Sequence, residues 1–301
     1  MNTTPTAPGE HILTTDGVDI RYRVAGRGPL LVVHPPGWGI GATPYTTTLS
    51  RLEDAFTVVY PWPRGAAGRP APAPDAQLDI PTFVTDLETL RAHLGADECL
   101  IAGHSHGGLI ALHYALRHPR RVSRLLLLNA QLTGVPSDGG PTPPAETPEP
   151  PRIAEAMRFL AEHGGLDALF TLQTDTEATA FLTHLLPLYF KDPAAMTPLA
   201  TALKPLTLSR RTLQKVTASD ANHPLPMNAV AQLQVPTVIV TGLHDRFCPV
   251  GQARFLAARM PRARLLEFEQ SGHFPWLEEP DAFFTRVRAA LLPAGRDAAL
   301  A

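Results

Sequence analysis

The sequence predicts an α/β protein with a mostly parallel sheet and a block of helices inserted late in the chain. Strand-like and helix-like segments alternate along most of the 301 residues, which is the pattern of a sheet covered by helices. The alternation stops between about residues 131 and 233, where only helical patterns follow a proline-rich stretch. A Gly-x-Ser-x-Gly motif stands where a predicted strand gives way to a predicted helix.

Eight segments have the apolar and β-branched composition of strands. The first two are joined through Asp16-Gly17, a dipeptide that favours a hairpin turn. The later ones are short apolar runs, which are typical of parallel strands buried on both faces. The predicted strands are His11–Thr15, Val18–Val24, Pro29–His34, Phe56–Tyr60, Cys99–Ala102, Arg124–Asn129, Thr237–Thr241 and Arg264–Phe268.

The segments between these strands have the apolar spacing of helices. Between residues 83 and 94, for example, Phe83, Leu87, Leu90 and Leu94 fall on one side of a helix. We predict helices at Thr46–Ala55, Phe83–Leu94, His106–Arg117, Ile153–Glu162, Ala178–Leu186, Val250–Met260 and Asp281–Leu292.

The middle of the chain predicts an insertion into the sheet. Seven prolines stand among the sixteen residues of Pro136–Pro151, which indicates a loop or linker. The helical patterns that follow contain no β-branched strand. We therefore expect a core formed by residues 1–130 and 234–301, and a helical cap formed by residues 131–233. A second independent domain is the alternative.

Composition excludes several classes of protein. With 44% hydrophobic residues the chain can bury a large core, and a net charge of −2 without a basic run argues against nucleic acid and anionic membranes as partners. Cys99 and Cys248 are too few and too far apart for a disulfide framework or a zinc ribbon. The first residues lack the features of a signal peptide, and the apolar runs are too short to span a bilayer. We expect a soluble, cytoplasmic protein with a small-molecule substrate; the sequence does not indicate an oligomeric state.

The sharpest motif is Gly103-His104-Ser105-His106-Gly107. A nucleophile elbow has this pattern at the joint between a strand and a helix, because the tight turn strains the backbone and exposes the serine hydroxyl. The flanking glycines allow neighbouring backbone to approach closely. The motif therefore predicts Ser105 as a catalytic nucleophile.

A serine nucleophile needs a base and an acid that orients the base. Asp245 directly follows the predicted strand Thr237–Thr241, and His273 follows Arg264–Phe268. Both fall at the carboxyl ends of strands, where an open α/β sheet places its site. We predict a triad of Ser105, Asp245 and His273. A turn cap for Asp245 and a packed loop histidine for His273 are the structural alternatives.

With these residues the chain resembles the α/β-hydrolase superfamily, and within it the proline iminopeptidase-like branch. The likeness runs from His11 to Leu292 and includes the turn His34-Pro35-Pro36-Gly37-Trp38-Gly39 and the glycine–arginine segment Arg64 to Arg69. It implies the α/β-hydrolase fold, with a mostly parallel eight-stranded sheet, helices on both faces and a helical cap. It also implies the same triad, with no metal and no organic cofactor.

The turn after the third strand departs from that family. A backbone N–H in this turn commonly holds the oxyanion in the family, and the position aligns with Pro36, which has no N–H. We expect the backbone N–H of His106 to be one donor and that of Gly37 or Trp38 to be the other. Trp62 stands where the family's second conserved segment begins with aspartate.

Histidines and aromatic residues are predicted to surround the triad. We expect the substrate pocket to be lined by His34, Pro36, Trp38, His104, Phe247 and Phe274. The pair His104-x-His106 is the obvious metal candidate, but the further ligands of a binuclear metallohydrolase motif do not follow it. We therefore predict no metal site, and interpret Cys248 as a small buried residue.

Together these features predict a serine-nucleophile hydrolase for an ester, amide or related acyl carbon of a bulky, hydrophobic small molecule or peptide-like substrate. A first alternative is a tailoring enzyme of natural-product biosynthesis on the same fold, which catalyses carbon–carbon bond formation, rearrangement or acyl transfer. A second alternative is a ligand-binding receptor with a vestigial triad.

Overall fold

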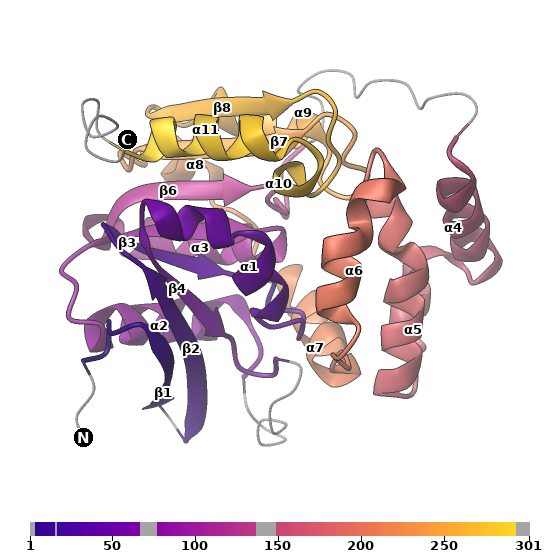
Figure 1. Ribbon diagram of the computed structural model, residues 1–301, viewed down its shortest axis with the longest axis horizontal. Helices are drawn as coiled ribbons and strands as arrows, with labels where there is room; N and C mark the ends of the chain where they lie inside the picture. Colours follow the sequence, from indigo (N-terminus) through magenta and orange to yellow (C-terminus); the bar gives the residue numbers. More distant parts are fainter. Residues whose placement is uncertain (1–3, 16, 67–76, 137–148, 293–301) are drawn as a thin grey trace.

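In a computed structural model, a twisted sheet forms the centre of the protein, and a group of helices lies beyond one end of its strands (Figure 1). The structure describes residues 4–15, 17–66, 77–136 and 149–292. Within these residues the sheet has eight strands in the order β1-β2-β4-β3-β5-β6-β7-β8. The strands are β1 (Gly9–Thr15), β2 (Val18–Gly26), β3 (Leu30–His34), β4 (Thr57–Trp62), β5 (Cys99–His104), β6 (Val122–Leu128), β7 (Thr237–Gly242) and β8 (Ala263–Phe268).

The sheet is parallel except at one edge. Strand β2 pairs antiparallel with both β1 and β4, whereas every pair from β4 to β8 is parallel. The predicted hairpin is present, because Thr15 pairs with Val18; Asp16 lies outside the described residues. The strands β5 to β7 are almost entirely buried, as their continuous apolar runs predict. Their carboxyl ends meet along one edge of the molecule.

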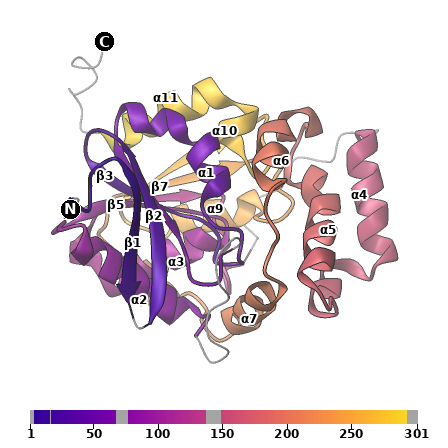
Figure 2. The same ribbon diagram turned by 60° about the horizontal axis from the view of Figure 1, so that its bottom comes forward.

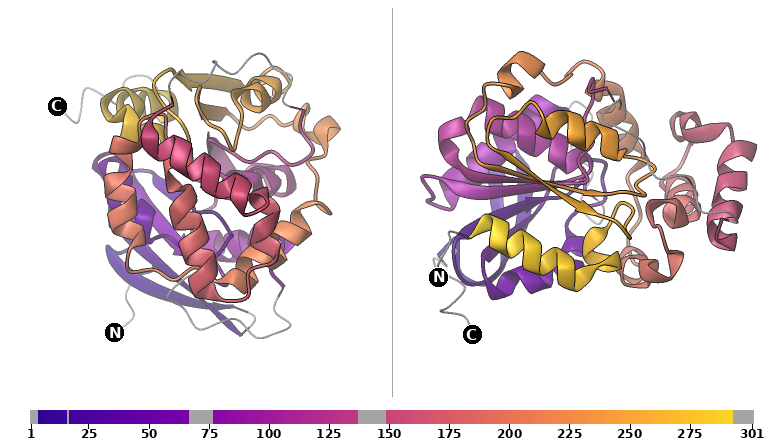
Figure 3. Two further views of the ribbon diagram at one scale, coloured as in Figure 1. Left: turned by 90° about the vertical axis from the view of Figure 1, so that its right-hand side faces the viewer. Right: turned by 90° about the horizontal axis from the view of Figure 1, so that it is seen from above.

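Helices cover both faces of the sheet (Figure 3, right). Apolar residues of α2, α3 and α9 pack on one face, and those of α1 and α11 pack on the other. The helices are α1 (Thr43–Thr48), α2 (Ile80–His93), α3 (His106–Arg117), α4 (Pro151–Glu162), α5 (Asp175–Leu185), α6 (Thr197–Leu203), α7 (Arg210–Asp220), α8 (Met227–Val230), α9 (Val250–Ala257), α10 (Pro275–Glu278) and α11 (Pro280–Leu291). Short 3₁₀ helices span Ser50–Asp54, Pro119–Arg121, Gly165–Phe170, Leu186–Tyr189 and Pro193–Met196.

The predicted elements agree with the structure except in one region. The single helix expected at Thr46–Ala55 is divided into α1 and the 3₁₀ helix Ser50–Asp54. Pro44 stands in the first turn of α1, where its fixed φ is favourable, so the helix begins earlier than predicted. The chain then bends at Leu49, whose side chain is fully buried.

Helices α4 to α8 lie between β6 and β7 in the chain, and α4 to α7 lie beyond the carboxyl ends of the strands in space (Figures 1 and 2). In the described part of this segment, the structure has helices and connecting loops without a strand. Much of the proline-rich stretch Pro136–Pro151 lies outside the described residues. None of the helices that the structure describes has the length and apolarity needed to cross a bilayer.

A buried ion pair fixes the loop that follows β4. The guanidinium of Arg64 donates from Nε to Oδ2 of Asp86 over 2.6 Å and from Nη2 to Oδ1 over 2.5 Å. Asp86 belongs to α2, and both residues are less than a tenth exposed. A bidentate pair of this kind sets the geometry of the loop, and each charge depends on its partner for solvation.

Replacing Asp86 by leucine should therefore destabilise the protein strongly. It removes the bidentate carboxylate from the buried Arg64 guanidinium, and breaking a buried pair in this way costs about 3–5 kcal/mol, whereas the double variant Arg64→Met/Asp86→Leu should recover much of this loss. Urea unfolding followed by circular dichroism measures both. As a control, Asp281→Ala breaks the exposed pair with Arg51 and should cost at most about 1 kcal/mol. Equal losses for Asp86→Leu and Asp281→Ala would contradict the assignment.

Candidate active site

Ser105 occupies a strained turn between β5 and α3. Its φ is 54° and its ψ is −124°, a combination that a residue with a side chain rarely adopts. The turn closes because Gly103 and Gly107 approach each other: a Cβ on Gly103 would lie 2.1 Å from the carbonyl oxygen of Gly107. The sequence thus folds here as a nucleophile elbow, with the serine side chain at the carboxyl edge of the sheet.

His273 and Asp245 are brought together at the same edge. Nδ1 of His273 lies 2.6 Å from Oδ2 of Asp245, and both side chains are buried. Because a carboxylate can only accept, Nδ1 carries the proton and the imidazole keeps Nε2 as its basic nitrogen. The other carboxylate oxygen of Asp245 accepts the backbone N–H groups of Phe247 and Cys248, each over 2.9 Å. These bonds fix the orientation of the Asp245 side chain.

Asn129 is a site residue that the sequence analysis did not identify. Its side chain donates to Oδ2 of Asp245 over 2.8 Å and to the carbonyl of Gly272 over 3.1 Å. It directly follows β6, has a positive φ of 41° and is 1% exposed. An asparagine after a buried strand was the available signal, but its contacts come from loops more than a hundred residues away.

The backbone of His273 is fixed from two sides. Its N–H donates over 2.7 Å to the carbonyl of Tyr189, in the segment between β6 and β7. Its carbonyl accepts from Nε2 of His104 over 3.1 Å, and Nδ1 of His104 accepts in turn from the Tyr45 hydroxyl over 2.7 Å. Burial and the nearby charge of His273 keep the pKa of His104 well below its usual value, so His104 stays neutral. His104 therefore supports the loop of the candidate base.

The predicted oxyanion donors differ in whether their N–H groups are already hydrogen-bonded within the protein. Pro36 has no N–H, and the N–H of Gly37 donates over 3.1 Å to Nδ1 of His106, so it is already engaged. Gly37, which we expected to be a possible donor, therefore faces the His106 ring in this structure. The backbone of His106 itself begins α3, where a helix leaves its first N–H groups free.

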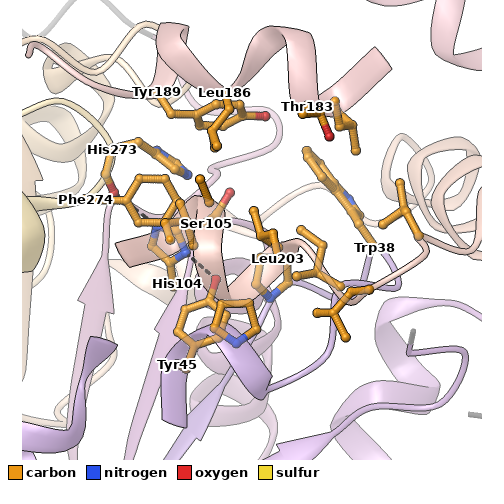
Figure 4. A pocket seen from close by; sticks show the side chains of 18 of the residues that line it. Trp38, Tyr45, His104, Ser105, Thr183, Leu186, Tyr189, Leu203, His273 and Phe274 are labelled. Carbon is orange, nitrogen blue, oxygen red and sulfur yellow. Dashed lines mark hydrogen bonds between the residues drawn. The ribbon is translucent and has the colours of Figure 1, made fainter. Parts of the chain in front are cut away.

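An apolar cavity of about 310 Å³ adjoins Ser105 and His273 (Figure 4). Four of the six predicted pocket residues line it: Pro36, Trp38, His104 and Phe274. Side chains of α5 and α6, with residues between them and after them, form the opposite wall, and the sequence analysis did not identify these. They include Thr179, Leu182, Thr183, Leu186, Leu199, Leu203, Leu206 and Leu208.

His34 and Phe247, the other two predicted pocket residues, are not among the residues that line this cavity. The His34 ring is directed away: its Nδ1 lies 2.6 Å from the Pro35 carbonyl and its ring meets Phe83 edge-on. Burial lowers the pKa of His34 to about 4, so it is a neutral structural residue. Phe247 stacks on Tyr189 with ring centres 4.0 Å apart, which places Tyr189 rather than Phe247 at the cavity.

One cluster among the described residues has the composition of a metal site. Asp245, Cys248 and His273 offer ligand atoms within 4.8 Å of one another. Both oxygens of Asp245 and Nδ1 of His273 already take part in the hydrogen bonds above, and burial raises the pKa of the Cys248 thiol well above its usual value. Since the thiolate is the form that binds metal, we interpret the cluster as a hydrogen-bonded network. His104 and His106 hold different partners and do not form a pair.

Glu278, at the end of α10, joins the loop of His273 to the segment after Tyr189. One carboxylate oxygen accepts the N–H groups of Lys191 and Asp192, over 2.7 and 3.2 Å, and the other accepts the N–H of Gly272 over 2.7 Å. Burial raises the pKa of Glu278 to about 7, although these three N–H groups act in the opposite direction.

The stability of the protein should therefore fall as Glu278 ionises. Between about pH 4.5, where an exposed glutamate loses its proton, and about pH 7, the folded state holds a proton that the unfolded state releases. Rising pH in this window favours unfolding, so the melting temperature of the wild type should drop by several degrees relative to Glu278→Gln from about pH 5 to about pH 8. Differential scanning calorimetry measures this. Melting curves that shift in parallel for both proteins would refute it.

Comparison with known proteins identifies the family. The family model of the α/β hydrolase fold matches residues 29–280. The chain is 27% identical to a pimeloyl-acyl-carrier-protein methyl ester esterase of Aromatoleum aromaticum over 85% of this chain and 94% of that protein. It is also 27% identical to a 2-hydroxymuconate semialdehyde hydrolase of a Pseudomonas species, over 95% of each. A hydrolase structure from Pseudomonas aeruginosa superposes with a TM-score of 0.73, at 22% identity, covering 95% of this chain and all of that one. The chain belongs to the α/β hydrolase fold family.

Proposed function

We propose that this protein is a serine hydrolase that cleaves an ester, or a related acyl compound, with a bulky hydrophobic body. One observation carries the proposal: a strained, cavity-facing Ser105 adjoins a histidine whose Nδ1 is held 2.6 Å from a buried aspartate. These are the nucleophile, base and orienting acid that acyl transfer requires. One relative of the chain is named as a methyl ester esterase and another as a semialdehyde hydrolase.

The chemistry follows from the tautomer of His273. Its Nε2 accepts the proton of the Ser105 hydroxyl as Oγ attacks the acyl carbon, and Asp245 stabilises the imidazolium that forms. The backbone N–H of His106 stabilises the oxyanion of the tetrahedral intermediate. The leaving group takes the proton from His273, and an acyl-enzyme remains on Ser105. Water, activated by the same nitrogen, then releases the acid.

The cavity lining supports a hydrophobic substrate. The hydroxyl of Thr179 donates to Asp175 and accepts from Leu208, and the hydroxyl of Thr183 donates to Thr179. These two hydroxyls are therefore satisfied within the protein, and the remaining wall is mostly leucine, proline and aromatic rings, together with Lys204. No carboxylate occurs among the described residues that line the cavity, so the lining offers no counter-ion for the α-amine of an aminopeptidase substrate. Proline iminopeptidase activity is for this reason not the function that we propose.

One feature favours the tailoring enzyme as the second candidate. Pro36 lacks an N–H and the N–H of Gly37 is bonded to His106, so two of the three residues Pro36–Trp38 offer no free N–H to an oxyanion. Losing one such donor costs about 10²–10³ in rate for acyl transfer. Chemistry that develops less charge on a carbonyl oxygen would suffer less from this loss.

A fluorophosphonate probe should label Ser105 covalently, because such probes react with activated serine nucleophiles. The experiment can be done although the natural substrate is not known. Gel fluorescence and mass spectrometry should show labelling of the wild type, none of Ser105→Ala and at least about 100-fold slower labelling of His273→Ala. Ser50→Ala, which changes an exposed serine of the 3₁₀ helix Ser50–Asp54, is the matched control and should label normally. A folded wild type that is not labelled would refute the hydrolase and favour the receptor. Labelling without turnover of p-nitrophenyl esters would favour the tailoring enzyme.

Filling the cavity should shift the preference of the enzyme toward short acyl groups. Leu203, on α6, lines the cavity together with Tyr45, and Leu203→Trp places an indole in the cavity. We expect kcat/KM for p-nitrophenyl hexanoate to fall by about 10-fold or more, with less than about threefold change for the acetate. Thr183→Val, which removes a hydroxyl already satisfied by Thr179, should leave the ratio unchanged. Equal losses for both esters in Leu203→Trp would argue that the acyl group lies elsewhere.

A further inference from the structure

We propose that His106 and Asp220 form a positioning pair that holds the turn Pro35–Trp38 in place and couples it to helix α7. The inference rests on the proposed function, because it assigns a role to the His106 side chain in the site of Ser105. Nε2 of His106 lies 3.0 Å from Oδ1 of Asp220, the last residue of α7. His106 is fully buried and Asp220 is 4% exposed. Neither residue takes part in the triad.

The hydrogen bonds determine the tautomer of His106. Nδ1 accepts the N–H of Gly37 over 3.1 Å, so Nδ1 carries a lone pair and the proton is on Nε2. Nε2 then donates to Asp220. A carboxylate on one nitrogen thus orients the ring so that the other nitrogen holds a backbone amide of the turn, in the way that an acid orients a catalytic histidine.

Hydrogen bonds also connect the His106–Asp220 pair to the backbone of Ser105. The second oxygen of Asp220 accepts from the side chain of Gln131 over 3.2 Å, and the backbone N–H of Gln131 donates to the carbonyl of Ser105 over 2.9 Å. The elbow, the turn after β3 and the end of α7 are therefore linked through side chains that are buried or half-buried. A displacement of α7 has a direct path to both sides of Ser105.

The same ring supports a wall of the cavity. The Trp38 indole stacks on His106 with ring centres 5.8 Å apart and planes at 25°, and Phe83 meets His106 edge-on. Among the residues that the structure describes, Nε1 of Trp38 is buried and has no hydrogen-bond partner, so none of them fixes the indole through a polar contact. A Cβ on Gly37 would lie 3.1 Å from Cε1 of His106, which shows how closely the turn packs on the ring. The position of Trp38 therefore depends on that of His106.

Loss of the Asp220 carboxylate should release the turn. Asp220→Leu keeps the volume but removes the acceptor, whereas Asp220→Asn keeps an oxygen that can accept from His106. Thr212→Val is the matched control: Thr212 is also buried on α7, and its hydroxyl anchors that helix to the carbonyl of Gly65 rather than to His106. All three are compared with the wild type by melting temperature, by steady-state kinetics on p-nitrophenyl acetate and by amide hydrogen exchange at Gly37, measured by NMR.

In Asp220→Leu we expect faster exchange at Gly37 and a kcat about 10- to 100-fold lower, with KM changed less than about threefold. Asp220→Asn and Thr212→Val should keep slow exchange at Gly37 and a kcat within about threefold of the wild type, even if Thr212→Val melts as early as Asp220→Leu. Unchanged exchange in Asp220→Leu, or faster exchange with unchanged kcat, would overturn the proposal. A kcat that falls equally in Thr212→Val would do so as well, because it would show a general effect of α7.

The experiments distinguish a failure of the proposed hydrolase function from a failure of the positioning pair. If the wild type does not turn over ester and does not react with the fluorophosphonate, the hydrolase is refuted, whereas exchange at Gly37 still shows whether Asp220 holds the turn. If the wild type is active and the Asp220 variants behave like the control, only the positioning pair is refuted.

Discussion

The backbone contact between Gly103 and Gly107 is the constraint on which the site depends. Because Gly103 has no Cβ, the chain can reverse from β5 into α3 within one residue, and in this reversal Ser105 has a φ of 54°. The same turn makes His106 the first residue of α3. Its backbone N–H belongs to the first turn of the helix, and its ring extends into the protein toward Asp220. One tight turn thus sets the direction of both the proposed nucleophile and the proposed positioning residue.

The remaining polar residues reach this turn from the ends of neighbouring strands. Asn129, Asp245 and His273 follow β6, β7 and β8, and parallel strands bring such positions to one edge without any contact being encoded locally. The helical segment adds a constraint of its own, since the carbonyl of Tyr189 holds the backbone N–H of His273. The proposed base is therefore held partly by the segment that also lines the cavity. Substrate shape and base position are not independent in this arrangement.

The sequence predicted most of the sheet because buried parallel strands leave continuous apolar runs. Motif and chain order selected Ser105, Asp245 and His273, which the fold brings to one edge of the sheet and which remain the proposed triad. The sequence did not predict Asn129, Asp220 or the leucines of α5 and α6. Their roles depend on contacts between segments far apart in the chain, and their local patterns match ordinary helix or loop residues. His34 and Phe247 were wrongly expected at the cavity for a related reason: position after a strand places a residue near the site, but only packing decides which way its ring points.

The turn after β3 shows why membership of the family predicts where the active site lies but not how well it stabilises an oxyanion. A proline at position 36 removes one N–H, and the N–H of the next residue is bonded to a histidine that the helix after Ser105 supplies. The donors that this turn can offer are thus determined by a side chain outside it, and that side chain is oriented by Asp220 from a third segment. Two chains with the same triad and the same fold can therefore differ in how well they stabilise an oxyanion. In this chain that difference depends on the tautomer of one buried imidazole.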